Sequence, residues 1–210
     1  MRRYVSRANR PLPAGFFDRD APVVARELLG ALLVSDCGAS RCIGRIVETE
    51  AYPGPHDPAS HAAAAVGHTE RNDPMYGPPG SAYLHLNFGI HWCLNVVVGS
   101  EGYPAAVLIR ALEPVEGIEA MRQRRDRRRD RELTSGPARL TQALAVGPHL
   151  QRHPLQRPPL VITPGTKVPE SALVRTTRVG ISRGADREWR YYDRRSRYVS
   201  RRDRAAEIGG

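Results

Sequence analysis

The sequence predicts an α+β fold, in which a mixed, mainly antiparallel, curved sheet is flanked by helices. The length of 210 residues gives room for one sizeable core. Hydrophobic residues at 40% and aromatic residues at 6% are typical of a globular chain. Runs with strand-like composition recur along the chain, with only short helical patterns between them. We therefore expect a single domain over residues 16–204, preceded by a flexible basic arm (1–15) and followed by a disordered end (205–210).

The first elements are a helix and a hairpin. Asp20 is a helix N-cap followed by Pro22 in the first turn, and the apolar stripe after it stops at Gly30. Two β-type runs, 31–35 and 41–50, are joined by a turn rich in Asp, Gly and Ser. This pattern predicts an antiparallel pair near the start of the sheet.

The middle of the chain alternates a long loop with further strands and helices. Residues 53–80 are rich in Pro, Gly, Asn, Asp and His, and a loop of this length is usually functional or disordered. Residues 81–98 and 105–110 are strand candidates. We expect helices opening at Pro114 and at Pro137. Beyond them we expect a weakly structured crossing over 151–176 and strands over 178–182 and 191–200.

The charge balance indicates a polyanionic partner. Lys and Arg total 32 against 22 Asp and Glu, a net charge of +10. Lys167 is the single lysine, so the excess is carried by arginine. Such a balance favours nucleic acid or an anionic membrane surface, with an acidic substrate as a third option.

Cysteine usage and hydropathy predict the compartment. The three cysteines, Cys37, Cys42 and Cys93, form no disulfide framework and no zinc-ligand pattern. The first residues have no apolar signal-peptide core, and nowhere do 18 apolar residues run together. We expect a cytoplasmic protein without a membrane span, associated with the nucleoid if the source is bacterial.

Two carboxylates are candidates for acid–base chemistry. Glu48 and Glu50 lie two apart in a strand-like run, so both side chains project from one face of the sheet. One of them could act as a base. The alternative is a solvated strand edge with no catalytic role.

The sequence does not contain the motifs of several other catalytic chemistries. The histidines of the middle region do not have metal-ligand spacing, and no phosphate-binding glycine loop or GxSxG sequence occurs. Lys167 lies in the sequence PGTKVPE without an acid-rich neighbourhood to tune it, which disfavours Schiff-base chemistry. We therefore expect neither a metal nor an organic cofactor.

Aromatic and basic residues interleave at 83–92 and 188–198, a composition typical of nucleic-acid surfaces. We interpret Tyr83, Trp92 and Trp189 as core aromatics. Phe88 differs, because it precedes Gly89 at an expected turn. An apolar ring at a turn is suited to wedge between base pairs.

Four sequence blocks, in this order, resemble the alkyladenine (3-methyladenine) DNA glycosylase family. They are RIVETEAYPGPHDPASHA, TERNDPMYGPPGSAYLHLNFGIHWCLNVV, VLIRALEPVEG and DRELTSGPARLTQAL, with weaker RVGIS and YVS blocks behind them. The resemblance extends from about residue 28 to 199. It implies a monomeric, monofunctional enzyme of base excision repair that flips a damaged purine out of double-stranded DNA.

The resemblance also assigns catalytic roles. The family's general base is the glutamate of its E-A-Y sequence, here Glu50, which activates water to attack the sugar C1′. A family arginine and a backbone carbonyl that hold this water correspond to Arg110 and Val179. Glu48 is then a supporting or structural residue. The implied lesions are 3-methyladenine and 7-methylguanine, with hypoxanthine and etheno-adenine as further candidates.

The family's base pocket corresponds to Tyr52, His61 and Asn95, and the asparagine excludes the amino group of normal guanine. Two positions depart from the family pattern: His85 replaces a pocket tyrosine and Phe88 replaces the intercalating tyrosine. The change at His85 puts the acceptance of neutral lesions in question.

The DNA-binding residues that we expect are Phe88, Met75, His91, Arg195 and Arg197. For the arginine run at 122–131, DNA contact and a solvated helix face are equally compatible with the sequence. The alternative functions are a non-catalytic damage-recognition or architectural DNA-binding protein and, less favoured, a hydrolase of free purine nucleosides.

Overall fold

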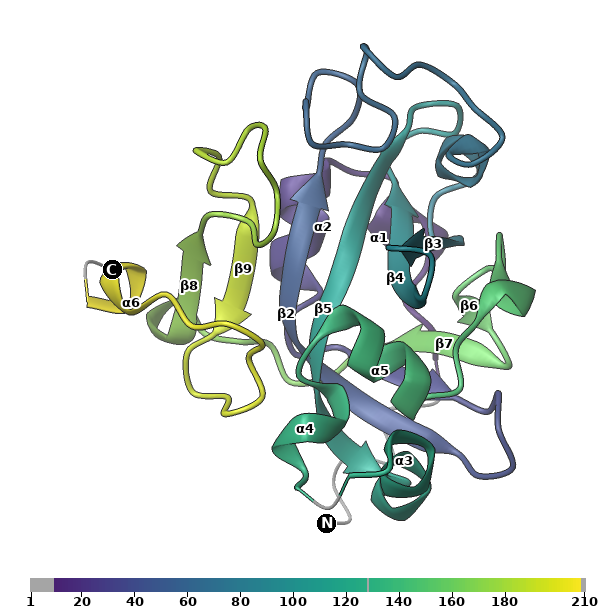
Figure 1. Ribbon diagram of the computed structural model, residues 1–210, viewed down its shortest axis with the longest axis vertical. Helices are drawn as coiled ribbons and strands as arrows, with labels where there is room; N and C mark the ends of the chain where they lie inside the picture. Colours follow the sequence, from purple (N-terminus) through teal and green to yellow (C-terminus); the bar gives the residue numbers. More distant parts are fainter. Residues whose placement is uncertain (1–9, 128, 209–210) are drawn as a thin grey trace.

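The computed structural model describes residues 10–127 and 129–208 and has an α+β architecture built on a curled antiparallel sheet (Figure 1). The strand order along the main path is β3-β4-β5-β2-β1-β7-β6, and β8 and β9 branch from β2. Figure 1 shows β2 and β5 in the middle, with β8 and β9 on one flank and β6 and β7 on the other. The predicted fold class is confirmed.

The two central strands are the longest of the described part of the chain. They are β2 (Cys42–Tyr52) and β5 (Ala105–Glu116), which pair antiparallel. On the other edge of β2 lies β1 (Leu32–Ser35), which forms the predicted antiparallel hairpin, with Ser35 opposite Cys42. The hairpin of β3 (Ala82–Asn87) and β4 (His91–Val98) extends the sheet beyond β5.

An irregularity interrupts the pairing of β2 and β5. The register shifts on both sides of Glu48, so that Val47 in β2 and Arg110 in β5 have no direct partner across the ladder. Such bulges turn side chains away from their regular direction. Past this point the free edge of β2 pairs with β9 (Arg190–Asp193), which also pairs with β8 (Leu173–Thr176). Glu48 and Glu50 therefore lie between two strands.

Short helices close the hydrophobic core around the sheet. They are α1 (Ala14–Phe17), α2 (Ala21–Glu27), α3 (Ile118–Arg125), α4 (Arg131–Thr134), α5 (Pro137–Ala143) and α6 (Arg204–Ile208). Three 3₁₀ turns are η1 (Asp73–Tyr76), η2 (Pro148–Leu150) and η3 (Glu170–Ala172). Val24 and Ala25 of α2 and Leu140 of α5 are buried in the main core with the sheet's apolar face. Burial of these side chains holds the helices, which are too short to be stable alone.

Three sequence-based element predictions are wrong. Pro114 does not open a helix: β5 continues to Glu116, and the helix starts after Gly117, whose positive φ of 75° turns the chain. The crossing over 151–176 contains β6 (Gln156–Arg157), β7 (Leu160–Thr163) and β8, because its apolar residues find partners elsewhere in the sheet. No strand forms over 178–182.

The chain ends also differ from prediction. Ordered structure begins before residue 16, since α1 starts at Ala14 and Leu12 donates its N–H to the carbonyl of Ile162. Residues 204–208 form α6 where the sequence predicts disorder, because Ala206 packs against Val174 and Tyr192. Residues 1–9 of the predicted arm and 209–210 lie outside the described residues.

Candidate active site

The two carboxylates of β2 are fully buried, which contradicts the solvated-edge alternative. Glu48 and Glu50 each have an exposed fraction of 0%. A buried carboxylate requires charged or hydrogen-bonding partners, because its desolvation is otherwise very unfavourable. Both carboxylates have such partners: they share Arg110, and their other partners differ.

Glu48 is held in a charge cluster inside the fold. Its Oε1 accepts from Nε of Arg110 at 3.1 Å and from NH1 of Arg190 at 3.0 Å. Its Oε2 accepts the backbone N–H of Ser200 at 2.6 Å. These bonds tie β2 to β5, to β9 and to the chain after β9. The arrangement is typical of a structural ion-pair network.

Glu50 is held by fewer charges and lies next to a cavity. Its Oε1 accepts the backbone N–H of Val179 at 2.7 Å and lies 3.2 Å from NH1 of Arg110. Its Oε2 accepts the hydroxyl of Tyr52 at 3.0 Å. Burial, and then the Glu50 carboxylate, raise the pKa of Tyr52 well above its ordinary value, so the hydroxyl stays protonated and donates.

Arg110 bridges the two carboxylates. Its position in the bulge of β5 lets one guanidinium reach both Glu48 and Glu50. Burial alone would lower the pKa of Arg110, but the charges of Glu50 and then Glu48 outweigh it and raise that pKa. The guanidinium is therefore a fixed cation between the two acids.

A cavity of about 170 Å³ opens against the residues that hold the Glu50 carboxylate. All four residues of the sequence-predicted base pocket, Tyr52, His61, His85 and Asn95, lie on its wall. The three partners of the Glu50 carboxylate line it as well: Tyr52, Arg110 and Val179. The structure thus gathers in one place residues from β2, β3, β4, β5, the 53–80 loop and the segment after β8. Val179 contributes its N–H to Glu50, a role different from the carbonyl contact that the resemblance implies.

The two pocket histidines are stacked on each other. The rings of His61 and His85 have centroids 3.6 Å apart and planes 27° apart. Burial in the pocket wall lowers the pKa of His61 to about 4 and, with His61 and Arg71 nearby, lowers the pKa of His85 to about 3. Both imidazoles are therefore neutral at neutral pH.

Sequence reasoning missed a buried ion pair behind the pocket. The guanidinium of Arg178 donates to Asp57 Oδ1 at 2.8 Å and to the carbonyl of Ala51 at 3.1 Å. It lies over the rings of Tyr52 and Trp189, 4.7 Å and 5.0 Å from their centroids. This pair fixes the long loop and the Val179 segment against β2. Its sequence signal was the presence of Asp57 and Arg178 inside two of the family-like blocks.

The tip of the β3–β4 hairpin projects from the sheet. Phe88 is 87% exposed and Ile90 is 71% exposed. Phe88 and Gly89 have positive φ values of 50° and 72°, a strained conformation for a phenylalanine. The exposed His91 follows at the start of β4. The tip is an exposed apolar point on the hairpin that also carries His85 and Asn95.

The other predicted DNA-binding residues lie in two places. Met75 is in the cavity wall, whereas Arg195 and Arg197 are away from it. Met75 is buried at 1% exposure and packs with Tyr83 in the wall of the cavity, so it does not lie on the outer surface of the protein. Arg195 is exposed and pairs with the buried Asp193, Nε to Oδ1 at 2.9 Å. Arg197 is exposed and donates to the hydroxyl of Tyr198. Neither arginine lines the cavity beside Glu50.

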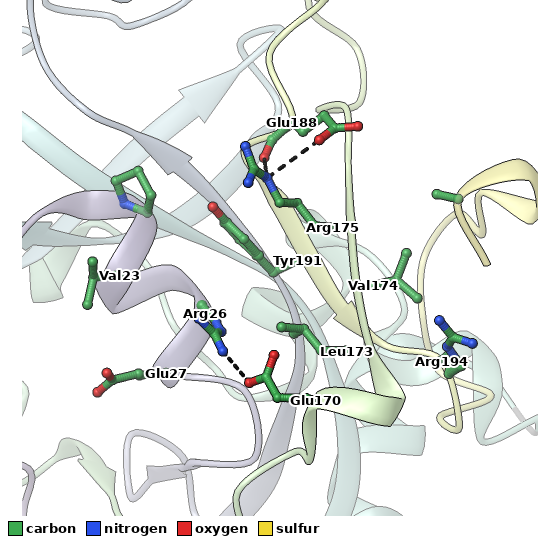
Figure 2. A pocket seen from close by; sticks show the side chains of 12 residues that line it. Val23, Arg26, Glu27, Glu170, Leu173, Val174, Arg175, Glu188, Tyr191 and Arg194 are labelled. Atoms are coloured by element: carbon green, nitrogen blue, oxygen red, sulfur yellow. Dashed lines mark hydrogen bonds and ion pairs between the residues drawn. The ribbon is translucent and has the colours of Figure 1, made fainter. Parts of the chain in front are cut away.

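A second hollow, of about 670 Å³, lies between α2 and the β8–β9 pair (Figure 2). Figure 2 shows two ion pairs among its charged side chains, Arg26 with Glu170 and Arg175 with Glu188. These four side chains are half exposed or more. Among the residues that the structure describes, no buried carboxylate lines this cleft.

Comparison with known proteins identifies the family. The family model for methylpurine-DNA glycosylase (MPG) matches residues 15–197. The chain belongs to the methylpurine-DNA glycosylase family. As a member of this family it is a DNA glycosylase, and DNA is its substrate.

Relatives cover nearly the whole chain. A protein of Carboxydothermus hydrogenoformans is 47% identical over 91% of this chain and 99% of its own length. A protein of Salinibacter ruber is 42% identical over 90% of this chain and 96% of its own length. Their names assign to them the activity of a 3-methyladenine DNA glycosylase. Within residues 10–127 and 129–208, no helix is long and apolar enough to cross a membrane.

Proposed function

We propose that the protein is a monofunctional DNA glycosylase that excises alkylated purines, such as 3-methyladenine and 7-methylguanine, from duplex DNA, with Glu50 as the general base. The observation that carries this proposal is the buried carboxylate of Glu50 next to a cavity of about 170 Å³. The names of the relatives support the lesion class.

In the proposed reaction, Glu50 accepts a proton from a water molecule while the water oxygen attacks C1′ of the flipped nucleotide. The N-glycosidic bond breaks, its electron pair leaves with the base, and an abasic site remains. The Val179 N–H and the Tyr52 hydroxyl orient the carboxylate. Arg110 offers fixed donors near the water, and such positioning lowers the entropic part of the barrier.

The cavity wall suits an alkylated purine. The aromatic ring of Tyr52 provides a π face, to which a cationic methylated base is attracted, and His61 lies on the same wall. We propose that Asn95 excludes the amino group of normal guanine and that His85 narrows the range of neutral lesions, such as hypoxanthine and etheno-adenine.

Flipping requires a residue that fills the space the nucleotide leaves. The exposed Phe88 at the hairpin tip fits this role, with His91 beside it. We propose that Arg195 and Arg197 contact phosphates and that the enzyme works as a monomer in the cytoplasm, on the nucleoid if bacterial.

The buried Glu50 favours an enzyme over a non-catalytic DNA-binding module. A carboxylate near DNA repels phosphate, and a purely binding protein gains nothing from desolvating one. A hydrolase of free nucleosides would have no use for an exposed wedge such as Phe88.

The test is a duplex carrying a single 7-methylguanine. After incubation with the protein we expect strand cleavage only when alkali is added, because a monofunctional enzyme leaves an intact abasic strand. We expect no hydrolysis of free 7-methylguanosine under the same conditions. Cleavage without alkali would contradict the monofunctional mechanism, and absence of alkali-labile sites would contradict the proposed activity.

A further inference from the structure

The wall of the base pocket contains a cluster formed by His61, Tyr83 and His85, whose mutual hydrogen bonds the proposed function does not use. The Tyr83 hydroxyl lies 3.0 Å from Nδ1 of His61 and 3.3 Å from Nδ1 of His85. Burial raises the pKa of Tyr83 to about 12, so the hydroxyl carries its proton. A hydroxyl has one proton to donate, so with two neutral imidazoles it donates to one Nδ1 and accepts from the other. The two histidines must therefore be opposite tautomers.

Arg71 decides which tautomer each ring takes. Its NH2 lies 3.4 Å from Nε2 of His85 and donates to the carbonyl of Leu86 at 2.9 Å. A guanidinium has donors and no acceptor, so His85 Nε2 must be the acceptor in this contact. The proton of His85 is then on Nδ1, from which it is donated to the Tyr83 oxygen.

The donor and acceptor in the Tyr83–His61 hydrogen bond follow from those in the Tyr83–His85 hydrogen bond. Because the Tyr83 oxygen accepts from His85, its own proton goes to Nδ1 of His61. His61 then carries its proton on Nε2. Within residues 10–127 and 129–208, the side-chain hydrogen bonds of His61 use Nδ1, so Nε2–H is left for a ligand. His61 lies on the wall of the cavity.

We propose that Arg71 is a positioning residue which, through His85 and Tyr83, fixes His61 in the Nε2–H tautomer and so presents a hydrogen-bond donor to the base in the pocket. This inference rests on the proposed function only in assigning the cavity to the flipped base. The chemistry that fits the donor is a base edge with a ring nitrogen or carbonyl oxygen acceptor, such as O6 of 7-methylguanine.

Arg71 is suited to this role by its location. It lies in the 53–80 loop and is exposed, so its replacement does not open the core. The His61 and His85 rings stack face to face, which holds both ring planes while the hydrogen bonds set the proton positions. Without Arg71 the hydrogen bonds can also run in the opposite direction. His61 Nδ1–H then donates to the Tyr83 oxygen, and the Tyr83 hydroxyl donates to Nδ1 of His85.

Nitrogen NMR of the full chain labelled with ¹⁵N-histidine reads the tautomers directly, without DNA. In the unmodified protein we expect His61 as the Nε2–H form and His85 as the Nδ1–H form. In Arg71→Met we expect both rings to shift toward mixed tautomers. In Tyr83→Phe, which keeps the ring and removes the hydroxyl, we expect His61 to become mixed while His85 keeps its Nδ1–H form. Arg175→Met, an exposed arginine of the distant cleft, is the matched control and should change neither ring.

Excision of 7-methylguanine from duplex DNA supplies the second readout. Loss of one oriented hydrogen bond predicts a decrease in kcat/KM of roughly fivefold to tenfold in Arg71→Met, and no decrease in Arg175→Met. An Nδ1–H form of His61 in the unmodified protein, or unchanged tautomers in Arg71→Met, would overturn the proposal. Shifted tautomers with unchanged kcat/KM would also overturn the positioning role. The NMR result does not depend on catalysis, so it separates failure of this inference from failure of the proposed glycosylase activity.

Discussion

The cavity beside Glu50 and the cleft between α2 and the β8–β9 pair differ in how their charges are compensated. The cleft is the larger, about 670 Å³ against about 170 Å³. Four of its charged side chains form two ion pairs at the surface, Arg26 with Glu170 and Arg175 with Glu188. Exposed pairs of this kind contribute about 0–1 kcal/mol each and leave no group poised for chemistry.

The smaller cavity contains the opposite arrangement. The neighbouring carboxylate of Glu50 is buried. It forms an ion pair with Arg110 and accepts hydrogen bonds from the Tyr52 hydroxyl and the Val179 N–H. Buried charges are stable only with such complete pairing, and removing one partner has a large effect. The comparison teaches that the position of a buried, partnered carboxylate identifies a site better than the size of a hollow.

The largest expected effect is that of Glu50→Gln. An amide cannot accept the proton from water, so we expect base release to fall by about 10²–10⁴-fold. Binding to damaged duplex should persist or tighten, because a negative charge near phosphate is removed. Single-turnover release of 7-methylguanine measures the effect. Glu170→Gln in the cleft of Figure 2 is the matched control, and an equal loss there would break the distinction between the two hollows.

Glu48→Gln should act on stability more than on chemistry. Glu48 compensates Arg110 and Arg190 inside the fold, so its neutralisation leaves buried positive charge. We expect a decrease in the free energy of unfolding of about 3–5 kcal/mol, measured by denaturant titration. Base release by the folded fraction should change much less than in Glu50→Gln. The converse result would mean that Glu48 is the base.

Phe88→Ala should weaken flipping without altering the cavity. The exposed ring is lost from the hairpin tip, and nothing fills the gap left by the extruded nucleotide. We expect a loss in kcat/KM of about tenfold for a well-paired lesion, in line with the roughly 1–3 kcal/mol of one aromatic stack. The loss should be smaller for the same lesion in a mismatch. Equal losses on both duplexes would exclude the wedge role.

The smallest effect is expected from the arginines after β9. Neutralising Arg195 and Arg197 together should flatten the slope of log affinity against log salt by roughly 0.9 to 1.8, one to two phosphate contacts. Arg195 already pairs with Asp193, which places the expected value for this pair nearer the lower end. The comparison pair is Arg127 and Arg128, for which we expect less change; Arg128 lies outside the described residues. Larger flattening from that pair would place DNA on the other side of the molecule.

Local sequence patterns gave the fold class, the first hairpin and the helix after Pro137, because periodicity and turn residues act over a few positions. These patterns failed where pairing with distant segments determines the secondary structure. Residues 160–163 become a strand only because β1 offers them an edge, and Pro114 stays in a strand because its neighbours pair with β2.

The candidate site was also predictable only in part from the sequence. The blocks of sequence located Tyr52, His61, His85 and Asn95, and the structure brings them to one wall. Burial of Glu50 and the bulge that turns Arg110 toward both carboxylates depend on strand pairing across distant parts of the chain. The burial of Met75 in the cavity wall likewise depends on packing against Tyr83, which sequence patterns do not show.

Chemical rescue tests the central claim, that the Glu50 carboxylate is the base, most directly. Glu50→Ala leaves a space beside the cavity that formate can enter. We predict that base release from a 7-methylguanine duplex is lost in Glu50→Ala and returns in part as formate is added, with no such return in Glu50→Gln, whose amide fills the space. Release at the unmodified rate by Glu50→Ala without formate would contradict the account.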